Sequence, residues 1–351
     1  MVWALVRVIK RGITNLCSSE PRVFPKSGWE SIDPSYFIEE ETIPTYRPEK
    51  FYPAHIGEII NHRYQIVGKL GYGSSASNRG HAYITLKIYT ASTTLTREIE
   101  IYNHQKTIQS NHADSHRTHT CLVHPPLGIS LDQLTPLLPG QVMTSAMVRA
   151  TMRNVLAALD FLHTEAQVIH TDLQPNNMLL GIKDDSILSK FEQAELDAPV
   201  ARKTLEDRTI YTSRPLPISL GTPVLCDLGE ARVGTDQQQG DIMPDVYRAP
   251  EVILGMTWDY KVDIWNVGMV VWDLLKRRHL FKARDPDPHA LLRSPPGEFL
   301  ARSEKCSQYW NEDGQWKGAA PLPDYSLESR EEKLHGDEKQ DFLRFLRRTL
   351  C

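Results

Sequence analysis

The chain has 351 residues, of which 40 % are apolar and 24 % are charged, and its formal net charge is −4. This length supports one large domain or two small ones, with a full hydrophobic core in either case. The charge balance argues against a protein that binds nucleic acid or a membrane surface, and it tolerates a basic partner. No apolar run approaches the roughly 18 residues that span a membrane.

Five cysteines are scattered along the chain without any C-x-x-C pair, which predicts a reducing compartment and no structural metal site. Residues 1–19 contain Arg7, Lys10 and Arg11 but no acidic residue. This composition is typical of a mitochondrial transit peptide or of a frayed basic tail. Residues 20–62 are rich in proline, glutamate and tyrosine. We therefore expect residues 1–62 to form an extended N-terminal leader.

Residues 63–70 and 81–89 are rich in β-branched and aromatic residues, which predicts two strands joined by a Gly/Ser loop. Side chains alternate along a strand, so Thr85 and Lys87 share one face. An unpaired lysine on a buried strand is costly, so Lys87 needs a functional partner. From about residue 131 the apolar residues recur at helical spacing. The sequence predicts an α+β fold, in which a small strand-rich lobe precedes a larger helical lobe.

The sharpest motif is His-Thr-Asp-Leu-Gln-Pro-Asn-Asn at residues 170–177. It resembles the catalytic loop H-R-D-x-x-x-x-N of protein kinases. Phosphoryl transfer needs a carboxylate that orients the attacking hydroxyl and an amide oxygen that binds magnesium, and these are the positions of Asp172 and Asn177. Taken alone, the motif is also consistent with a polar loop that follows a strand.

Two further motifs follow in the kinase order, and the segment after the second belongs with it. Residues 224–229, Val-Leu-Cys-Asp-Leu-Gly, resemble the D-F-G element, whose aspartate, here Asp227, binds magnesium. Residues 247–251, Tyr-Arg-Ala-Pro-Glu, resemble the A-P-E element that closes the activation segment. Asp263 begins a segment that resembles the helix whose aspartate braces the catalytic loop. Alone, Asp-Leu-Gly would indicate only a turn.

The strand-rich region carries a resemblance to the nucleotide-binding elements of kinases. In a glycine-rich loop, Gly71 and Gly73 would let the backbone approach the phosphates, although a lone G-x-G is also a hairpin turn. Lys87 would hold the α- and β-phosphates, and Thr85 stands where the lysine motif has alanine. Glu98 occupies the position of the glutamate that pairs with this lysine, with a solvated helical charge as the alternative.

Residues 121–128 resemble the hinge of a kinase, where the adenine bonds to backbone groups. Pro125 still offers its C=O group there, and Leu127 still offers its N–H group. Six ordered motifs over residues 70–265 thus identify a eukaryotic protein kinase. The Asp-Leu-Gly element, the approach to the glycine-rich loop and a long spacer resemble the serine/arginine-rich protein kinases, and particularly their divergent fungal members.

This resemblance implies a two-lobed kinase fold with a small lobe at residues 63–127 and a large lobe at residues 128–351. The spacer at about 181–222 would be an ordered surface excursion or disordered. ATP would lie in the cleft between the lobes, with Mg²⁺ held by Asn177 and Asp227 while Asp172 orients the hydroxyl of a serine or threonine.

Substitutions in the motifs bear on regulation and rate. The arginine of H-R-D, which normally binds the activation-loop phosphate, is Thr171, and Thr235 and Tyr247 are the only hydroxyl side chains in residues 228–250. We therefore predict a kinase that activation-loop phosphorylation does not switch. At the nucleotide site, the lysine that usually follows the catalytic aspartate by two is Gln174. It donates a hydrogen bond but no charge, so transition-state stabilisation should be weaker.

Two segments are shorter than the family requires. Residues 74–86 are too few for the usual second strand and turn before the lysine strand, and residues 99–126 are too few for the rest of a helix and two strands. The chain ends at Cys351, so the large lobe is expected to be truncated at its C-terminus. Glu251 of the A-P-E element would then lack its usual buried arginine.

These departures leave a pseudokinase that binds nucleotide or a partner as the alternative to an active serine/threonine kinase. A small-molecule phosphotransferase shares the catalytic loop but generally lacks the A-P-E element. The family resemblance implies protein substrates such as Arg/Ser-rich splicing factors, no direct contact with nucleic acid or membrane, and a monomer. It places the protein in the cytoplasm or nucleus, with the mitochondrion as the alternative.

Overall fold

The computed structural model describes residues 2–9, 20–71, 83–90, 97–104, 109–113, 118–234, 236–276, 278–281, 297–317 and 326–350. The chain separates into two compact units. The strand-rich unit comprises Met1–Leu131 and Asn176–Asp227, and the helical unit comprises Asp132–Pro175 and Leu228–Cys351. The spacer thus groups with the strand-rich unit, although the sequence analysis assigned it to the large lobe.

The strand-rich unit is built on a six-stranded antiparallel sheet with the strand order β2-β3-β1-β4-β6-β5. Its strands are β1 (Val2–Val8), β2 (Ile59–Ile60), β3 (Tyr64–Gly71), β4 (Tyr83–Ile88), β5 (Gln109–Ala113) and β6 (Thr118–His124). Helix α1 (Arg97–His104) connects β4 to β5 along the chain. Both strands that the sequence analysis expected to be missing after Glu98 are present, because α1 is only eight residues long.

Strand β1 differs most from the sequence-based expectation, which assigned residues 1–62 to a leader. It lies inside the sheet and pairs antiparallel with both β3 and β4. Its apolar residues are buried on both faces: Ala4 and Val6 pack into one core cluster, and Leu5 packs into another. The N-terminal segment therefore supplies the strand for which residues 74–86 are too short.

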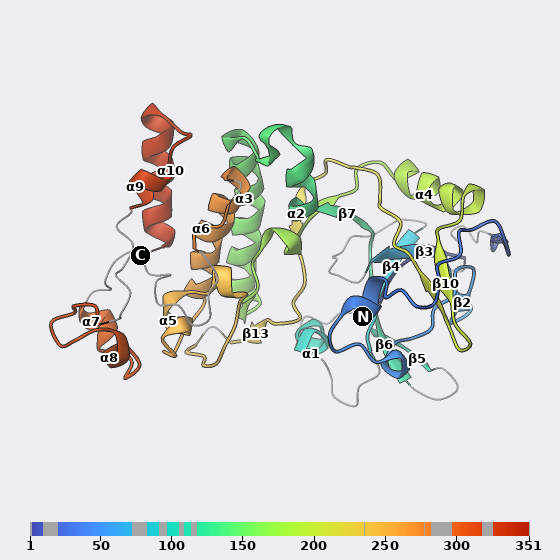
Figure 1. The fold of residues 1–351 in the computed structure, drawn as a ribbon, viewed down its shortest axis with the longest axis horizontal. Helices are drawn as coiled ribbons and strands as arrows, with labels where there is room; N and C mark the ends of the chain where they lie inside the picture. Colours follow the sequence, from blue (N-terminus) through green and yellow to red (C-terminus); the bar gives the residue numbers. More distant parts are fainter. Residues whose placement is uncertain are drawn as a thin grey trace. The chain divides into compact units, whose positions relative to one another are not determined.

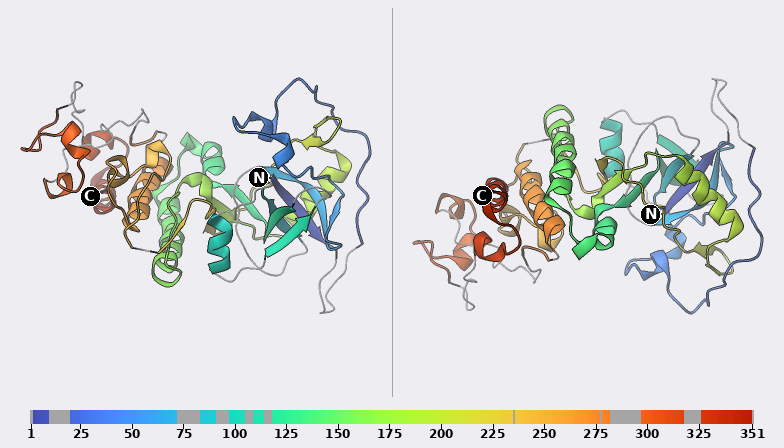
Figure 2. Two further views of the ribbon diagram at one scale, coloured as in Figure 1. Left: turned by 90° about the horizontal axis from the view of Figure 1, so that it is seen from below. Right: turned by 90° about the horizontal axis from the view of Figure 1, so that it is seen from above.

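The spacer is ordered and packs beside this sheet. It connects β9 (Met178–Gly181) to β12 (Pro223–Leu225), which form a small sheet with β7 (Leu127–Ser130). The spacer itself contains α4 (Ser186–Asp197) and the hairpin of β10 (Arg202–Thr204) and β11 (Thr209–Tyr211). Leu188 and Phe191 of α4 pack against Leu5 and Val67 of the large sheet. Figure 2 shows α4 lying along that sheet.

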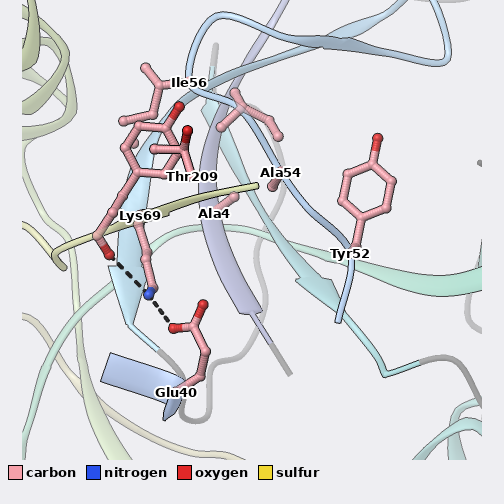
Figure 3. A pocket seen from close by; sticks show the side chains of 10 residues that line it. Ala4, Glu40, Tyr52, Ala54, Ile56, Lys69 and Thr209 are labelled. Atoms are coloured by element: carbon pink, nitrogen blue, oxygen red, sulfur yellow. Dashed lines mark hydrogen bonds and ion pairs between the residues drawn. The ribbon is translucent and has the colours of Figure 1, made fainter. Parts of the chain in front are cut away.

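The segment between β1 and β3 also packs on the sheet, and it does so through charged side chains. Lys69 of β3 is buried, and its ammonium group donates to the Glu40 carboxylate and to the backbone oxygen of Tyr211 at 3.0 Å (Figure 3). Lys203 of the spacer donates to Glu41 at 2.8 Å. These contacts join the leader, β3 and the spacer into one packed body.

The helical unit is centred on α3 (Ser145–Asp160) and α6 (Lys261–Leu275), which lie side by side (Figure 1). Helix α10 (Gly336–Thr349) packs on α6, where Phe342 stacks on Trp272 with a centroid separation of 6.1 Å. The unit also contains β8 (Val168–Ile169), β13 (Arg232–Val233), α5 (Pro250–Ile253), α7 (Gly297–Leu300), α8 (Cys306–Tyr309) and α9 (Leu327–Arg330), with α2 (Leu131–Leu134) at its start. Across the described residues, no helix is long and apolar enough to cross a membrane.

Candidate active site

The strand-rich unit brings Lys87, Glu98 and Asp227 together. Lys87 of β4 is fully buried, and its ammonium group donates to the Glu98 carboxylate and lies 3.2 Å from Oδ1 of Asp227. The Tyr89 hydroxyl donates to the same oxygen of Glu98. Burial raises the pKa of Glu98, and the charge of Lys87 opposes this rise. The sequence-predicted lysine and glutamate therefore form a buried ion pair that holds the lysine beside Asp227.

Asn177 and Asp227 are brought close by the pairing of β9 with β12. Met178 pairs with Leu225, so the residues just beyond this pair, Asn177 and Cys226, also face each other. The Cys226 N–H donates to the backbone oxygen of Asn177 at 2.9 Å. Asp227 follows with φ of 65°, a conformation that strains a residue with a Cβ and that often marks a functional site.

The donor set of Asn177 and Asp227 fits a magnesium ion. Magnesium is usually bound in proteins by one or two side-chain oxygens, and the nucleotide phosphates and water complete its octahedron. The part of the chain that the structure describes holds no cluster of three or more His, Cys, Asp or Glu side chains that could bind a metal alone.

Other predicted nucleotide-site residues occupy the same unit. Gly71 ends β3, whereas Gly73 lies outside the described residues. Thr85 is 1 % exposed, and its hydroxyl has no hydrogen-bond partner in the described structure. Pro125 follows β6 and Leu127 begins β7, which places the predicted hinge between the two sheets. Their roles in binding a nucleotide stay predictions.

In the helical unit, Asp263 fixes the backbone of the catalytic loop. Its carboxylate accepts the N–H groups of His170 and Thr171, each at 2.8 Å, and the ring Nε2 of His163 lies 2.8 Å from it. Asp263 is fully buried at the start of α6. Thr171 has φ of 63°, so this brace holds a strained turn immediately before Asp172.

The side chain of Asp172 is oriented by its own loop. Nε2 of Gln174 donates to Oδ1 of Asp172 at 2.8 Å. The amide of Asn266 on α6 donates to the backbone oxygen of Leu173 at 3.3 Å and ties this loop to the helix. Gln174 therefore contacts the predicted catalytic carboxylate directly, and its predicted contact with the nucleotide stays a prediction.

The activation segment is joined to the catalytic loop by a hydrogen bond from Thr171. The Thr171 hydroxyl donates to the backbone oxygen of Glu230 at 2.7 Å, so a neutral hydrogen bond stands where the family has an arginine. Tyr247 is buried, and its hydroxyl donates to Oδ2 of Asp273 at 2.6 Å, which makes it a poor phosphate acceptor in the folded chain. Thr235 lies outside the described residues.

Glu251 of the A-P-E element is mostly enclosed. Burial raises the pKa of its carboxyl group, and the positive charge of Arg302 opposes the rise. Among the described residues, Glu251 forms no ion pair within 4 Å. Arg302 instead donates to the backbone oxygen of Thr257 at 3.3 Å.

Sequence reasoning missed the contribution of β1 to this site. Trp3 pairs along its backbone with both Gly71 and Lys87. The signal was present, because Val2–Val8 reads Val-Trp-Ala-Leu-Val-Arg-Val, a run with high strand propensity, in a chain that was one strand short. Tyr89 was also missed, although it follows Lys87 by two positions and shares its face of the strand.

Comparison with known proteins agrees with this geometry. The chain is 37 % identical to a serine/threonine protein kinase of Aspergillus fumigatus, over 95 % of this chain and 91 % of that one. It is 27 % identical to the serine/threonine-protein kinase SRPK of Physarum polycephalum, over 80 % of this chain and 78 % of the relative. A crystal structure of a kinase domain superimposes with a TM-score of 0.55 at 21 % identity and covers 86 % of this chain and 88 % of that one. No family model matches.

The fold is therefore that of a protein kinase, as predicted. The relatives are named as serine/threonine protein kinases, and nothing among them favours the pseudokinase alternative. With a relative this similar over nearly its whole length, and with the lysine–glutamate pair and braced catalytic loop in place, the chain belongs to the serine/threonine protein kinases, as a divergent member related to the SRPK group.

Proposed function

We propose that this kinase transfers the γ-phosphoryl group of Mg-ATP to serine hydroxyls in Arg/Ser-rich proteins. The observation that carries the substrate class is a set of carboxylates around Tyr247 in the helical unit. Burial raises the pKa of the Tyr247 hydroxyl, and the negative charges of Asp273, Asp132 and Asp172 raise it further. Asp273 is shared between the Tyr247 hydroxyl and His279, so Asp132 and Asp172 are the carboxylates that supply negative charge beside the catalytic loop.

Arginine-rich peptides suit such a surface. A guanidinium group binds carboxylates through paired hydrogen bonds and remains charged at any physiological pH. Asp132 is exposed and Asp172 is partly exposed, so both can meet a peptide, whereas Asp273 is occupied by Tyr247. Asp132 is therefore the best candidate for direct contact with a substrate arginine.

The acidic segment near the C-terminus supports docking less well. Glu331 is buried in an ion pair with Lys276, and Glu328 is paired with Arg347. Carboxylates that are already paired with cations attract a basic substrate less strongly. The carboxylates beside the catalytic loop are thus favoured over residues 328–341.

In the proposed reaction the acceptor hydroxyl oxygen bonds to the γ-phosphorus as the bond from that phosphorus to the β-phosphate oxygen breaks. Asp172 orients the hydroxyl and takes its proton. Lys87, held by Glu98, binds the phosphates of ATP and withdraws charge from them. Magnesium, held by Asn177 and Asp227, would neutralise the charge of the phosphates when bound.

The test is a comparison of kcat/KM for three peptides that differ only at the basic positions: Arg/Ser, Lys/Ser and Glu/Ser repeats. We expect the Arg/Ser peptide to be preferred by at least about tenfold over the Lys/Ser peptide, because bidentate pairing is lost in lysine. Asp132→Asn should reduce kcat/KM for the Arg/Ser peptide and leave the KM for ATP unchanged. Phosphorylation that is undiminished in Asp172→Ala would come from a contaminating kinase. Equal rates on the Arg/Ser and Glu/Ser peptides would rule out the proposed substrate class.

We further propose a monomer that works in the cytoplasm or nucleus. Strand β1 is packed within the sheet, which argues against a segment removed during mitochondrial import. Light scattering during gel filtration tests the monomer. A C-terminal fluorescent fusion tests the compartment, and its recovery in mitochondria with residues 1–19 removed would contradict the proposal.

A further inference from the structure

Strand β1 lies between β3, which ends at the start of the glycine-rich loop, and β4, which carries Lys87. Both elements resemble those with which kinases bind the phosphates of ATP. Along one edge, Trp3 pairs with Gly71, where the glycine-rich loop begins. Along the other edge, Trp3 pairs with Lys87 and Leu5 pairs with Thr85. Since the strand order is β3-β1-β4, β3 and β4 are neighbours of β1 and not of each other. The register between Gly71 and Lys87 is therefore set through β1.

The packing of β1 fixes its position on both faces of the sheet. Leu5 and Val6 are fully buried on opposite faces. Ala4 lines a cavity of about 30 Å³ together with residues of the leader, β3 and β11, including Lys69 and Glu40 (Figure 3). Space of this size can hold a water molecule. A slip by one residue would exchange the side chains of β1 between the two core clusters and would move Arg7 to the opposite face of the sheet, away from Glu192.

A buried ion pair fixes the C-terminal half of β1. The Arg7 guanidinium donates to both oxygens of Glu192, at 3.1 and 2.8 Å, and Glu192 is 1 % exposed. The Tyr83 hydroxyl of β4 donates to the same carboxylate at 2.7 Å. Glu192 thereby joins β1, β4 and α4 of the spacer. Breaking such a pair leaves a buried charge, which is strongly unfavourable, so the register is specified by charge as well as by apolar packing.

We propose that Val2–Val8 is a positioning segment of the nucleotide site, which holds the start of the glycine-rich loop at the correct register from Lys87. Without it, β3 and β4 would each have an open edge, and the Lys87–Glu98 pair would lose its fixed relation to Gly71. The inference concerns ATP binding only. It rests on the assignment of Lys87 and Gly71 to the site that binds the phosphates of ATP, and it is independent of the protein substrate.

The first test is chemical and does not depend on activity. In the full chain, Val8→Cys with Tyr64→Cys should form a disulfide under mild oxidation, because Val8 and Tyr64 are register partners. The matched control, Val8→Cys with Arg63→Cys, places the second thiol on the opposite face and should not cross-link. Mass spectrometry of peptides under non-reducing conditions measures both. Failure of Val8→Cys with Tyr64→Cys to cross-link would overturn the placement of β1.

The second test measures ATP binding by Mg-ATP-dependent thermal stabilisation and by the KM for ATP. Leu5→Pro removes a ladder N–H and should raise the KM for ATP at least tenfold, while the KM for the peptide substrate changes little. Val23→Pro, at an exposed leader residue, should leave both constants unchanged. Wild-type ATP binding by a chain that lacks residues 2–9 would refute the proposal.

A third measurement covers the case in which the shortened chain folds poorly. A synthetic peptide of residues 2–9 should restore ATP binding to that chain, and the same peptide with proline in place of Leu5 should not. Asp172→Ala separates this inference from the proposed function, because it should reduce transfer by about 10²–10⁴-fold while the thermal stabilisation by Mg-ATP persists. Restoration by both peptides alike would show that a register-specific strand is not required.

Discussion

At the scale of single residues, Asp263 shows how a buried carboxylate can be stable when hydrogen-bond partners surround it. It accepts two backbone N–H groups and contacts the ring of His163, all within one unit. A carboxylate with three partners recovers much of the solvation that it loses on burial. Its benefit to function is indirect, since the residues that it holds carry Asp172.

The first prediction follows from those contacts. Asp263→Ala should lower the free energy of unfolding by about 1–3 kcal/mol for each of the two backbone N–H groups left without a partner. The turnover number should fall by a larger factor than that by which the KM for ATP changes, because the position of Asp172 is disturbed. Urea denaturation and steady-state kinetics measure the two effects. Asp160→Ala, at an exposed position on α3, serves as the control and should change neither.

A second prediction concerns pH. The hydrogen bond from His279 Nδ1 to Asp273 Oδ2, 2.7 Å long, raises the pKa of His279, with burial acting against it. A histidine with a raised folded pKa adds stability below its unfolded value of about 6.5, and this contribution is lost as the pH rises through the folded value. The charges of Asp273 and Asp132 both favour the protonated ring.

The measurement is urea unfolding at a series of pH values for the wild type and for His279→Gln. The wild type should lose stability relative to the variant as the pH rises above about 6.5. Nuclear magnetic resonance of the His279 ring gives the same pKa directly, and Asp273→Asn should lower it. An identical pH dependence in the wild type and His279→Gln would contradict the assignment.

At the scale of elements, α4 is the part of the spacer that packs against the large sheet. Phe191 is 2 % exposed and fills the space above Gly68 of β3, where a Cβ atom would lie 2.7 Å from the Phe191 ring. Glu195 on the same helix binds Arg214 at 2.9 Å and Arg202 at 3.4 Å. The spacer is therefore a part of the core of the strand-rich unit.

The third prediction tests this role. Phe191→Ala should destabilise the strand-rich unit by about 3–5 kcal/mol, the usual range for a buried aromatic residue, and should weaken stabilisation by Mg-ATP. Lys190→Ala, at the neighbouring exposed position of the same helix, should have little effect. Thermal unfolding with and without nucleotide compares them. Equal stability of the two variants would show that α4 does not support the sheet.

The motifs could be predicted from the sequence because each is a short segment whose chemistry is local. Asp172 and Asn177 keep the spacing of the kinase catalytic loop, Asp227 lies in its own short Asp-Leu-Gly element, and Lys87 with Glu98 needs only a strand followed by a helix. Strand β1 could not be placed in this way. Its propensity is visible in the sequence, but the edges with which it pairs are set by long-range packing and by the distant Glu192.

At the scale of the whole molecule, the two units divide the chemistry between them. Lys87, Asn177 and Asp227 belong to the strand-rich unit, whereas Asp172 belongs to the helical unit. The chain crosses between the units at residues 175 and 176, inside the catalytic loop itself. Nucleotide binding and proton transfer should therefore be separable by mutation.

The fourth prediction uses this division. Asp172→Ala should reduce the turnover number by about 10²–10⁴-fold, the usual range for loss of a catalytic base, and should keep the thermal stabilisation by Mg-ATP. Asp227→Ala should remove both transfer and the magnesium-dependent part of the stabilisation. Calorimetry with ATP, with and without magnesium, distinguishes the two variants. Loss of nucleotide binding in Asp172→Ala would argue against the division.

The pairing of β1 also has a consequence for how fast the protein folds. Its partners are residues 64–71 and 83–88, so long chain loops must close before its hydrogen bonds form. Closing long loops costs entropy before any contact repays it, and sheets made of such non-local pairs fold slowly. Until β1 docks, β3 and β4 present open edges that can pair with other chains. Refolding yield should therefore fall with protein concentration, and the nucleotide site should form late in folding.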